Sequence, residues 1–490
     1  RHRGGRVHKE RPTYETSIGG LWFDSVSGET YTISNPAHKS QILGAFQRSV
    51  HDDAVSAIEA ARKALPGWSS TPAPQRAAIL YRAMQLMEER GDQLARSITI
   101  EEGKPIADAH GEVKRSMNIT EYAAGEGRRM FGNTTPSELP NTLAYTTRRP
   151  LGVVGILTPW NFPLAIPAWK ISPALICGNT LVFKPASATP MTAIELVKIF
   201  QDAGLPPGVL NLITGPGSSV GNTIVDHPDV DGVSFTGSTE VGPALYTRAT
   251  QTLKKVQAEM GGKNAVIVME DADMDSALGG IVQGAFGSTG QRCTATSRAI
   301  VQESVYDSFM TELTERTSKL TIGDGLDPEM DISPLASQAQ LDKVMEYIGI
   351  GAEEGATLAY GGNALTEGSF DEGYYVEPTI FTDVDTNMRI AQEEIFGPVL
   401  TVFKARDLED AVSISNNVKF GLSSSIYTMD IPQAFRYIDT VESGIVHVNS
   451  PTLGGEVHLP FGGTKESGFG RELSPLGIVE FTNVKTVWVK

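Results

Sequence analysis

Two periodicities of hydrophobic and polar residues divide this chain. In its first part apolar positions recur every three to four residues, which predicts amphipathic helices at 52–65, 75–90 and 93–126. Pro66 is expected to end the first helix, and Gly103-Lys104-Pro105 is expected to break the third. Ahead of these helices, residues 22–49 alternate short extended runs with turn residues, which predicts an antiparallel hairpin.

After Pro150 short apolar runs alternate with helical segments, a pattern typical of βαβ units on a parallel sheet. The first series has predicted strands at 152–157, 180–184, 209–213 and 233–235, and predicted helices at 167–174, 190–203 and 218–225. The second has predicted strands at 264–269, 299–302, 399–404, 424–427 and 445–448, and predicted helices at 274–284, 304–320, 341–354, 407–415 and 432–441. Two α/β domains that meet near residues 260–263 are therefore predicted.

Between the two patterns lies a polar connection, 133–140, followed by an extended segment at 142–149. This segment is predicted to form an exposed strand outside the main body. An exposed strand edge has to be paired or blunted, so pairing with another subunit is expected.

The chain has 490 residues and a net charge of −17, although its first eleven residues carry five basic side chains and one glutamate. So acidic a body argues against nucleic acid as a partner, because phosphate binding needs a basic face. There is no apolar run of about 18 residues, so no membrane-spanning helix is predicted. The basic start lacks the apolar core of a secretory signal and is expected to be a disordered arm over residues 1–16.

The chain has only two cysteines, which cannot form a disulfide framework and favour a reducing, cytoplasmic setting. Cys177 lies in an apolar stretch and is expected to be buried. Cys293 lies among small polar residues, next to Arg292 and Thr294, where backbone amides and positive charge are expected to favour a thiolate. Cys293 is therefore the candidate nucleophile, although an isolated free cysteine is more often a small buried hydrophobe.

Four further stretches carry candidate chemistry. Asn161 follows a predicted strand, where its amide can donate to an oxyanion or simply form a turn. Lys184 ends another strand, and Gly237-Ser238 open a helix, which together suit an anion or a ribose; the alternative is an ordinary turn with a solvated lysine. Gly215-Pro216-Gly217 does not have the glycine spacing of the dinucleotide fingerprint and is interpreted as an unrelated loop.

Glu259 is followed by two glycines, which would let a carboxylate approach a water and retreat, as a general base must; a surface glutamate is the alternative. Glu394 and Phe396 lie in a turn that could face ribose and nicotinamide, or could simply be a capped turn with a buried aromatic ring.

In their order along the chain, seven motifs resemble the NAD(P)-dependent aldehyde dehydrogenase superfamily. They are Pro159–Pro163, Phe183–Pro185, Phe235–Ser238, Glu259–Lys263, Gly290–Cys293, Glu393–Val399 and Pro460–Gly468. Within the superfamily, the segments 286–298 and 166–170 look most like α-ketoglutarate semialdehyde (2,5-dioxopentanoate) dehydrogenases. No metal ligand set is predicted.

The resemblance implies an α/β aldehyde dehydrogenase-like fold with two Rossmann-like domains and a small β oligomerisation element. The expected cofactor-binding domain comprises 17–132 and 150–260, the catalytic domain 261–470, and the oligomerisation element 133–149 and 471–490. A homodimer or a homotetramer is expected.

The same resemblance implies the roles of the catalytic residues. Cys293 would attack the aldehyde carbon, Asn161 and the Cys293 amide would hold the oxyanion, and Glu259 would activate the water that hydrolyses the thioester. Since a thiolate is both a good nucleophile and a good leaving group, one cysteine can serve both halves of the reaction.

For the cofactor, Lys184 and Glu394 would hold ribose hydroxyls, Trp160, Gly237 and Ser238 would lie at the pyrophosphate, and Phe396 would meet the nicotinamide riboside. Strongly NAD-preferring members often carry a glutamate at the position of Ser187, where a carboxylate would repel a 2′-phosphate. The serine predicts that NADP is accepted and that NAD is also used, and it leaves open whether NADP is preferred.

By the same analogy the aldehyde tunnel would be lined by five side chains and the loop 449–456. The side chains are Phe162, Trp169, Arg292, Thr294 and Phe461. An anionic substrate needs a positive anchor that the sequence does not identify, and Arg292 could instead pair with one of the protein's own carboxylates.

Several alternatives stay open at this point. The substrate could be succinic semialdehyde, betaine aldehyde or an aliphatic aldehyde, and the thioester could pass to coenzyme A instead of water. A non-catalytic binding protein of the same fold and a simple cysteine hydrolase are further alternatives. The presence of Cys293, Glu259 and Asn161 argues against a non-catalytic binding protein. A cysteine hydrolase is disfavoured because no histidine with a suitable local context pairs with Cys293.

Overall fold

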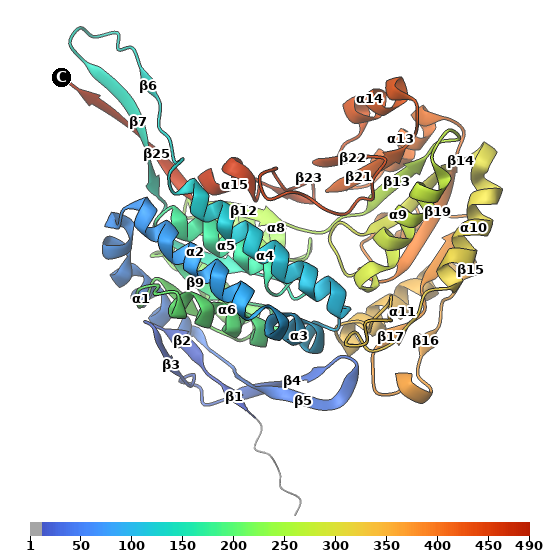
Figure 1. Ribbon diagram of the computed structural model, residues 1–490, viewed down its shortest axis with the longest axis horizontal. Helices are drawn as coiled ribbons and strands as arrows, with labels where there is room; N and C mark the ends of the chain where they lie inside the picture. Colours follow the sequence, from blue (N-terminus) through green and yellow to red (C-terminus); the bar gives the residue numbers. More distant parts are fainter. Residues whose placement is uncertain (1–11) are drawn as a thin grey trace, which may run out of the picture.

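Two large and mostly parallel sheets lie beside each other, and a narrow ribbon of strands projects from the body (Figure 1). This computed structural model describes residues 12–490. Helices cover both faces of each large sheet, as the alternation of predicted strands and helices requires.

The first large sheet has eight strands in the order β24-β12-β11-β8-β9-β10-β2-β3. Its five central strands are parallel: β12 (Lys255–Glu259), β11 (Gly232–Thr236), β8 (Val153–Leu157), β9 (Thr180–Lys184) and β10 (Leu210–Leu212). Its edges are antiparallel: β24 (Gly468–Phe469), β2 (Thr16–Ile18) and β3 (Leu21–Phe23).

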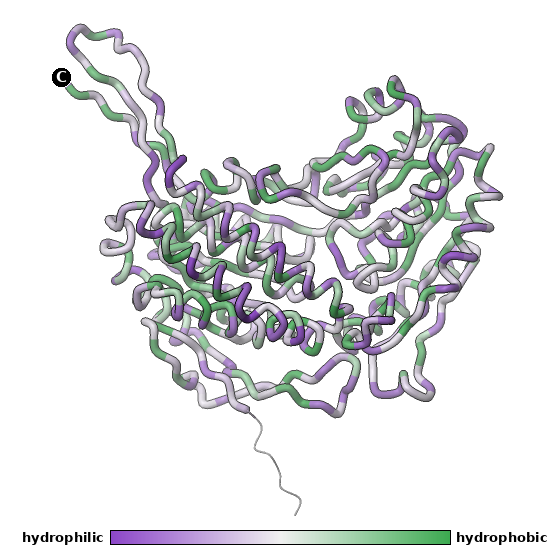
Figure 2. Tube along the Cα trace, viewed as in Figure 1, coloured by the Kyte–Doolittle hydropathy of each residue, from purple (hydrophilic) through white to green (hydrophobic). Residues whose placement is uncertain are grey.

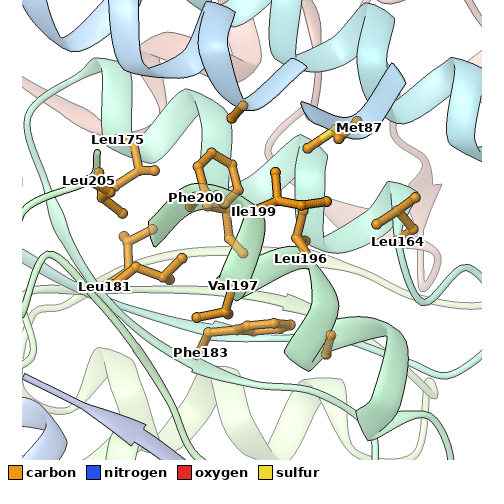
Figure 3. Close-up of a cluster of buried hydrophobic side chains, with 14 of the residues drawn as sticks. Met87, Leu164, Leu175, Leu181, Phe183, Leu196, Val197, Ile199, Phe200 and Leu205 are labelled. Carbon is orange, nitrogen blue, oxygen red and sulfur yellow. The ribbon is translucent and has the colours of Figure 1, made fainter. Parts of the chain in front are cut away.

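Alternate residues of these strands face two different cores, because side chains point to opposite faces of a sheet in turn. Leu181 and Phe183 face a core formed with α2 (Ala73–Glu89), α3 (Gly91–Glu102), α4 (Ile106–Glu126), α5 (Ala165–Ile176) and α6 (Pro190–Asp202). Figure 3 shows Phe183, Val197 and Phe200 within this core. Val182 faces the other core, with α1 (His51–Ser70), the π-helical turn Gly217–Gly221, α7 (Asn222–Asp226) and α8 (Gly242–Thr250).

The second large sheet has seven strands in the order β15-β18-β19-β14-β13-β21-β22, all parallel except β15. They are β15 (Thr357–Tyr360), β18 (Thr379–Thr382), β19 (Val399–Ala405), β14 (Thr296–Gln302), β13 (Asn264–Val268), β21 (Ser423–Tyr427) and β22 (Ile445–Val448).

Helices also pack on both faces of this sheet. They are α9 (Met274–Phe286) and α10 (Tyr306–Ser318) on one face, and α13 (Leu408–Asn416) and α14 (Ile431–Thr440) on the other. A further core forms around α11 (Gln338–Glu353) and α12 (Arg389–Gln392).

The projecting ribbon consists of β25 (Thr482–Val489), β7 (Leu143–Pro150) and β6 (Thr134–Thr135), all antiparallel. Apolar side chains on this ribbon are exposed to solvent, and Trp488, for example, is 66% exposed. Figure 2 shows hydrophobic stretches along the ribbon where it extends from the body. The strand expected at 142–149 is confirmed. A second small sheet joins β1 (Thr13–Tyr14), β5 (His38–Gln47) and β4 (Thr30–Asn35).

The remaining elements are short. They are the strand pair β16 (Ala364–Leu365) and β17 (Tyr375–Val376), the strand pair β20 (Phe420–Gly421) and β23 (Thr464–Lys465), α15 (Ser474–Val479), and three 3-10 turns at Gly287–Gly290, Glu303–Val305 and Gly368–Phe370.

Most of the elements expected from the pattern are confirmed, including the β4–β5 hairpin and the break between α3 and α4. The prediction that Pro66 ends the first helix is wrong, because α1 continues to Ser70. The extra turn buries Trp68, and this burial offsets the hydrogen bond that proline cannot donate. Strands β12 and β18 were not expected from the pattern.

The predicted disordered arm, 1–16, lies mostly outside the described residues. Its last part is ordered, since Thr13–Tyr14 pairs with β5 and Thr16 belongs to β2, where it is buried. None of the helices within residues 12–490 combines the length and the apolar character that a membrane crossing requires.

Candidate active site

Cys293 lies where two cavities meet. It follows α9 and the 3-10 turn Gly287–Gly290, in which Ser288 and Thr289 both have left-handed backbone angles (φ +48° and +57°). Non-glycine residues take up this conformation only where the surroundings hold them there. One holding contact is the hydrogen bond, 2.7 Å long, from Thr289 Oγ1 to the Ser333 carbonyl. The chain therefore enters the nucleophile position through a tightly fixed turn.

The first cavity lies on the side of the eight-stranded sheet and continues into a larger one. Cys293, Asn161, Glu394 and Phe396 line the first cavity. The larger cavity, of about 640 Å³, is lined by Lys184 and by residues of the π-helical turn and α8. Trp160, Gly237 and Ser238 line both, so six of the seven residues predicted for the cofactor border one continuous space.

The donor set of this space fits a dinucleotide. Burial lowers the pKa of Lys184 to about 8, and its Nζ donates to the Pro185 carbonyl at 2.6 Å. Within residues 12–490 it forms no ion pair, so two of the three ammonium hydrogens remain for a ligand. The N-terminus of α8 borders the same cavity and adds backbone amides suited to phosphate.

Ser187 is the seventh residue predicted for the cofactor, and it does not line either part of this space as the described residues form it. Its Oγ donates to the Gly215 carbonyl at 3.0 Å. Gly217, from the glycine pair that the sequence analysis set aside, lines the larger cavity together with Ser218. The segment 215–218 therefore belongs to the site, although not through the dinucleotide fingerprint.

Glu394 and Phe396 border the first cavity from the catalytic side. The backbone amide of Gly262 donates to Glu394 Oε1 at 3.1 Å, and Phe396 stands edge-on to Trp160 with ring centroids 5.4 Å apart. Phe396 has a left-handed φ of +63°, and Gln340 Nε2 holds its carbonyl at 2.7 Å. The hydrogen bond from Gln340 therefore fixes the strained backbone of Phe396.

The second cavity, of about 250 Å³, opens on the other side of Cys293. All five side chains predicted for the aldehyde tunnel line it: Phe162, Trp169, Arg292, Thr294 and Phe461. Leu453 and Gly454 from the predicted loop line it as well. Trp169 and Phe461 pack against each other with ring centroids 5.4 Å apart, so one wall is aromatic.

Arg292 does not supply the positive charge to the nucleophile that its place in the sequence predicted. It pairs with one of the protein's own carboxylates, which was the alternative left open. Its Nη2 lies 2.8 Å from Asp108 Oδ2, and it also donates to Ser288 Oγ at 2.7 Å. Instead, burial raises the pKa of Cys293, and the carboxylates of Glu259, Glu394 and Glu472 raise it further. Both effects disfavour the thiolate, so the thiol proton has to be removed before the sulfur attacks.

Arg115 of α4 also lines the second cavity, and this cation was not predicted from the sequence. Its Nη1 donates to the Gly455 carbonyl at 2.6 Å, and its guanidinium lies 5.8 Å from the centre of the Trp169 ring. Burial lowers the pKa of Arg115, and a thiolate at Cys293 opposes that shift. No carboxylate among residues 12–490 pairs with it, which distinguishes it from Arg292.

Asn161 is buried at the carboxyl end of β8, on the wall of the first cavity. Its Nδ2 donates to the Gln291 carbonyl at 3.1 Å, so the side-chain amide lies against the segment that carries Cys293. An amide in this position can donate to an oxygen bound at the nucleophile.

Glu259 ends β12 and is 1% exposed, and neither carboxylate oxygen has a hydrogen-bond partner among residues 12–490. Burial raises its pKa well above the ordinary value, and the charge of Glu472 adds to the shift. A side chain on Gly462 would place its Cβ 3.1 Å from Glu259 Oε2, so this glycine leaves room for the carboxylate. Glu259 does not line either of the two cavities as the described residues form them.

Lys170 and Glu472 lie beside Glu259 and were not expected from the sequence. Lys170 Nζ contacts Glu472 Oε1 and donates to Ser234 Oγ at 2.9 Å. The Lys170 charge opposes the rise in the Glu259 pKa. Gln340 and Lys343 of α11, which line the first cavity, were also missed, because single polar residues on a helix carry no motif.

Comparison with known proteins agrees with this geometry. The model of the Aldehyde dehydrogenase family matches residues 22–487. The alpha-ketoglutaric semialdehyde dehydrogenase of Bacillus subtilis is 45% identical over 485 residues, which cover 99% of either protein.

Two solved structures share the fold. A betaine aldehyde dehydrogenase from Staphylococcus aureus in complex with NAD+ has a TM-score of 0.95 and 34% identity, with 97% of this chain and 94% of that chain covered. An Escherichia coli NADP dependent enzyme has a TM-score of 0.94 and 39% identity, with 97% of this chain and 98% of that chain covered. The protein described here therefore belongs to the aldehyde dehydrogenase family.

Proposed function

We propose that this NAD(P)-dependent aldehyde dehydrogenase oxidises a carboxylated semialdehyde, and that α-ketoglutarate semialdehyde is its substrate. The observation that carries the proposal is Arg115, whose guanidinium lies in the cavity on the aldehyde side of Cys293 and pairs with no carboxylate of the described part of the chain. A neutral or cationic aldehyde would leave this buried charge without a partner, whereas a terminal carboxylate would pair with it. The name of the Bacillus subtilis relative points to the same substrate.

Cys293 is the nucleophile in this proposal. Its sulfur attacks the aldehyde carbon, and the thiol proton leaves to a base. The carbonyl oxygen becomes an oxyanion, which the Asn161 amide and the Cys293 backbone N–H stabilise. A nicotinamide cofactor held beside Cys293 would supply the hydride acceptor for the former aldehyde carbon, and Cys293 would then carry the acyl group as a thioester.

Glu259 acts in the second half. Its carboxylate takes a proton from a water molecule, whose oxygen attacks the thioester carbon, and the Cys293 thiolate leaves as the acid is released. The raised pKa of Glu259 makes it a stronger base than an exposed glutamate.

The cofactor is NADP or NAD, and we propose that NADP is accepted well. Lys184, Trp160, Gly237, Ser238, Glu394 and Phe396 would hold it in the continuous cavity. At Ser187 no carboxylate is present to repel a 2′-phosphate, and the Lys184 ammonium adds attraction.

Arg115→Gln tests the substrate proposal, and Arg292→Gln is the matched control in the same cavity. We expect the Arg115 variant to raise the KM for α-ketoglutarate semialdehyde roughly 10- to 100-fold, the loss expected for one charge-assisted hydrogen-bonding partner. The KM for pentanal, which has no carboxylate, should change less than about threefold. The proposal fails if both substrates respond equally, or if the unaltered protein prefers pentanal or betaine aldehyde.

The same assay separates hydrolysis from transfer to coenzyme A. With coenzyme A present, we expect free acid as the product, because in this proposal Glu259 is the base that activates water for attack on the thioester. Acyl-CoA as the main product would favour the acylating alternative. Absence of cofactor reduction with every aldehyde would favour a binding protein.

We further propose a homodimer or homotetramer in the cytoplasm, built through the ribbon β6-β7-β25. Leu143, Val484 and Trp488 are 56%, 61% and 66% exposed on it, which is costly for a strand that stays in water. We assign 17–132 with 150–260 to cofactor binding, 261–470 to catalysis, and 133–149 with 471–490 to assembly. Trp488→Glu should lower the mass measured by light scattering, and an unchanged mass would exclude this surface.

A further inference from the structure

The segment that carries Asn161 is held by a buried ion pair from another part of the chain. Lys104, between α3 and α4, and Glu112, on α4, have side chains that are 1% and 0% exposed. Lys104 Nζ lies 2.7 Å from Glu112 Oε2. Taking the two charges of a buried ion pair out of water costs free energy. When one partner is removed, the other is left as an uncompensated buried charge, which destabilises the fold.

Both members of the pair bind the active-site segment. Lys104 Nζ donates to the Asn161 carbonyl at 2.7 Å and lies 4.0 Å from the centre of the Phe162 ring. Glu112 Oε1 accepts from the backbone amides of Leu164 and Ala165 at 2.9 and 3.0 Å. The ion pair thus fixes the backbone of the segment at both ends, from Asn161 to the first turn of α5.

This restraint acts on the side chain that matters for the oxyanion. Asn161 has no secondary structure of its own, and its amide direction follows from the backbone angles of the segment. Its Nδ2 donates to the Gln291 carbonyl, two residues before Cys293. A small change at the Asn161 carbonyl would therefore move the amide away from an oxygen bound at Cys293, and such hydrogen bonds weaken steeply with distance and angle.

We infer that Lys104 and Glu112 are positioning residues that aim the Asn161 amide at the oxyanion and set the Phe162 ring in the aldehyde cavity. Neither residue needs to touch the reacting atoms, since Lys104 acts through the Asn161 backbone and Glu112 through the start of α5. The inference rests on the proposed function, because it presupposes aldehyde oxidation at Cys293 with Asn161 as a donor.

A double-mutant cycle with Asn161→Ala tests this inference. In the unaltered protein we expect Lys104→Met to lower kcat roughly 10- to 100-fold, a large part of what one oxyanion donor contributes, with little change in KM. In the Asn161→Ala background the same substitution should lower kcat less than about threefold, because the amide that Lys104 positions is gone. A merely structural role would give the same loss in both backgrounds.

Lys104→Met leaves Glu112 as an unpaired buried charge and can prevent folding. The double substitution Lys104→Met/Glu112→Gln removes both charges of this pair and should show the same dependence on Asn161. Glu102, whose Oε2 lies 3.9 Å from Lys104 Nζ, still accepts the Lys104 backbone amide at 3.0 Å. Arg76→Met is the matched control, because Arg76 is also a buried cation that binds backbone carbonyls, those of Ile176 and Thr71, away from the cavities. It should lower thermal stability while kcat stays within about threefold of the unaltered value.

The outcomes separate this inference from the proposed function. Equal losses in both backgrounds would overturn the positioning role alone, and so would a Lys104→Met/Glu112→Gln variant with normal kcat. Normal turnover of Asn161→Ala would overturn both the donor role of Asn161 and its positioning. Binding of NADPH, followed by fluorescence, and alkylation of Cys293 by iodoacetamide should stay within about threefold in the Lys104 variants, since the cofactor cavity and the thiol are not what the ion pair holds.

Discussion

Arg292 and Asp108 form an ion pair of 2.8 Å that joins the nucleophile turn to the start of α4. Ser288 Oγ also donates to Asp108, so the carboxylate holds this turn at two points. Arg292 precedes Cys293 in sequence, yet its guanidinium is used for structure. The charge left for a substrate comes from Arg115 on the same helix.

This relationship predicts how an Arg292→Gln variant behaves. The turn that carries Cys293 should loosen, so kcat should fall about 3- to 30-fold, which corresponds to roughly 0.6–2 kcal/mol. The fall should be equal for α-ketoglutarate semialdehyde and for pentanal, because Arg292 is not the carboxylate anchor. Steady-state kinetics with both aldehydes measures this, and a loss confined to the semialdehyde would show that Arg292 does bind the carboxylate.

We predict that Ser187→Glu changes the cofactor preference. On the proposal that Ser187 faces the 2′ position of the bound cofactor, a carboxylate there would repel a 2′-phosphate, and kcat/KM with NADP should fall at least about tenfold. With NAD it should change less than about threefold. Ser187→Ala serves as the control that removes the Oγ hydrogen bond to Gly215 without adding charge. If Ser187→Glu leaves the NADP to NAD ratio untouched, Ser187 does not face the 2′ position.

Local motifs predicted much of this site because short segments carry their own geometry. Cys293, Asn161 and Lys184 each follow an element whose pattern is clear, and the carboxyl ends of parallel strands meet at one edge of a sheet. Arg292 shows the limit of this reasoning. Its position next to Cys293 left open whether its guanidinium serves the site or pairs with one of the protein's own carboxylates, and the sequence could not identify Asp108 as the partner.

The residues missed from the sequence are those placed by long-range packing. Arg115 and Lys104 belong to the helical first part of the chain, and only the packing of α4 against α5 brings them to Cys293 and Asn161. Strand β12 was missed because Lys255, Gln257 and Glu259 give it no apolar run, and its partners β11 and β24 define it.

Glu259→Gln predicts a burst of cofactor reduction. Hydride transfer needs Cys293 and Asn161, whereas hydrolysis of the thioester needs a base. We therefore expect about one equivalent of reduced cofactor per subunit in the first turnover, followed by a steady state at least about 100-fold slower. Stopped-flow absorbance measures both phases. Loss of the burst itself would place Glu259 in the first half of the reaction, as the base that takes the thiol proton.

The burial of Glu259 also predicts a pH dependence of stability. Its pKa is raised well above the ordinary value in the folded protein, whereas in the unfolded chain it is about 4.3. Between these two pKa values the folded state binds more protons, so stability falls as pH rises through this window and stays lower above it. The stability that protonated Glu259 contributes is fully present below the unfolded pKa.

Glu259→Gln removes this ionisation, so it should raise the melting temperature relative to the unaltered protein more at pH 8 than at pH 4.5. We expect the difference between the two pH values to be about 2–4 °C. Glu466→Gln is the control, since Glu466 is an exposed glutamate paired with Lys419 on the surface. Its effect should be small at both pH values. If Glu259→Gln shows no more pH dependence than this control, the Glu259 carboxylate is not held in an apolar setting, and its strength as a base would have to come from elsewhere.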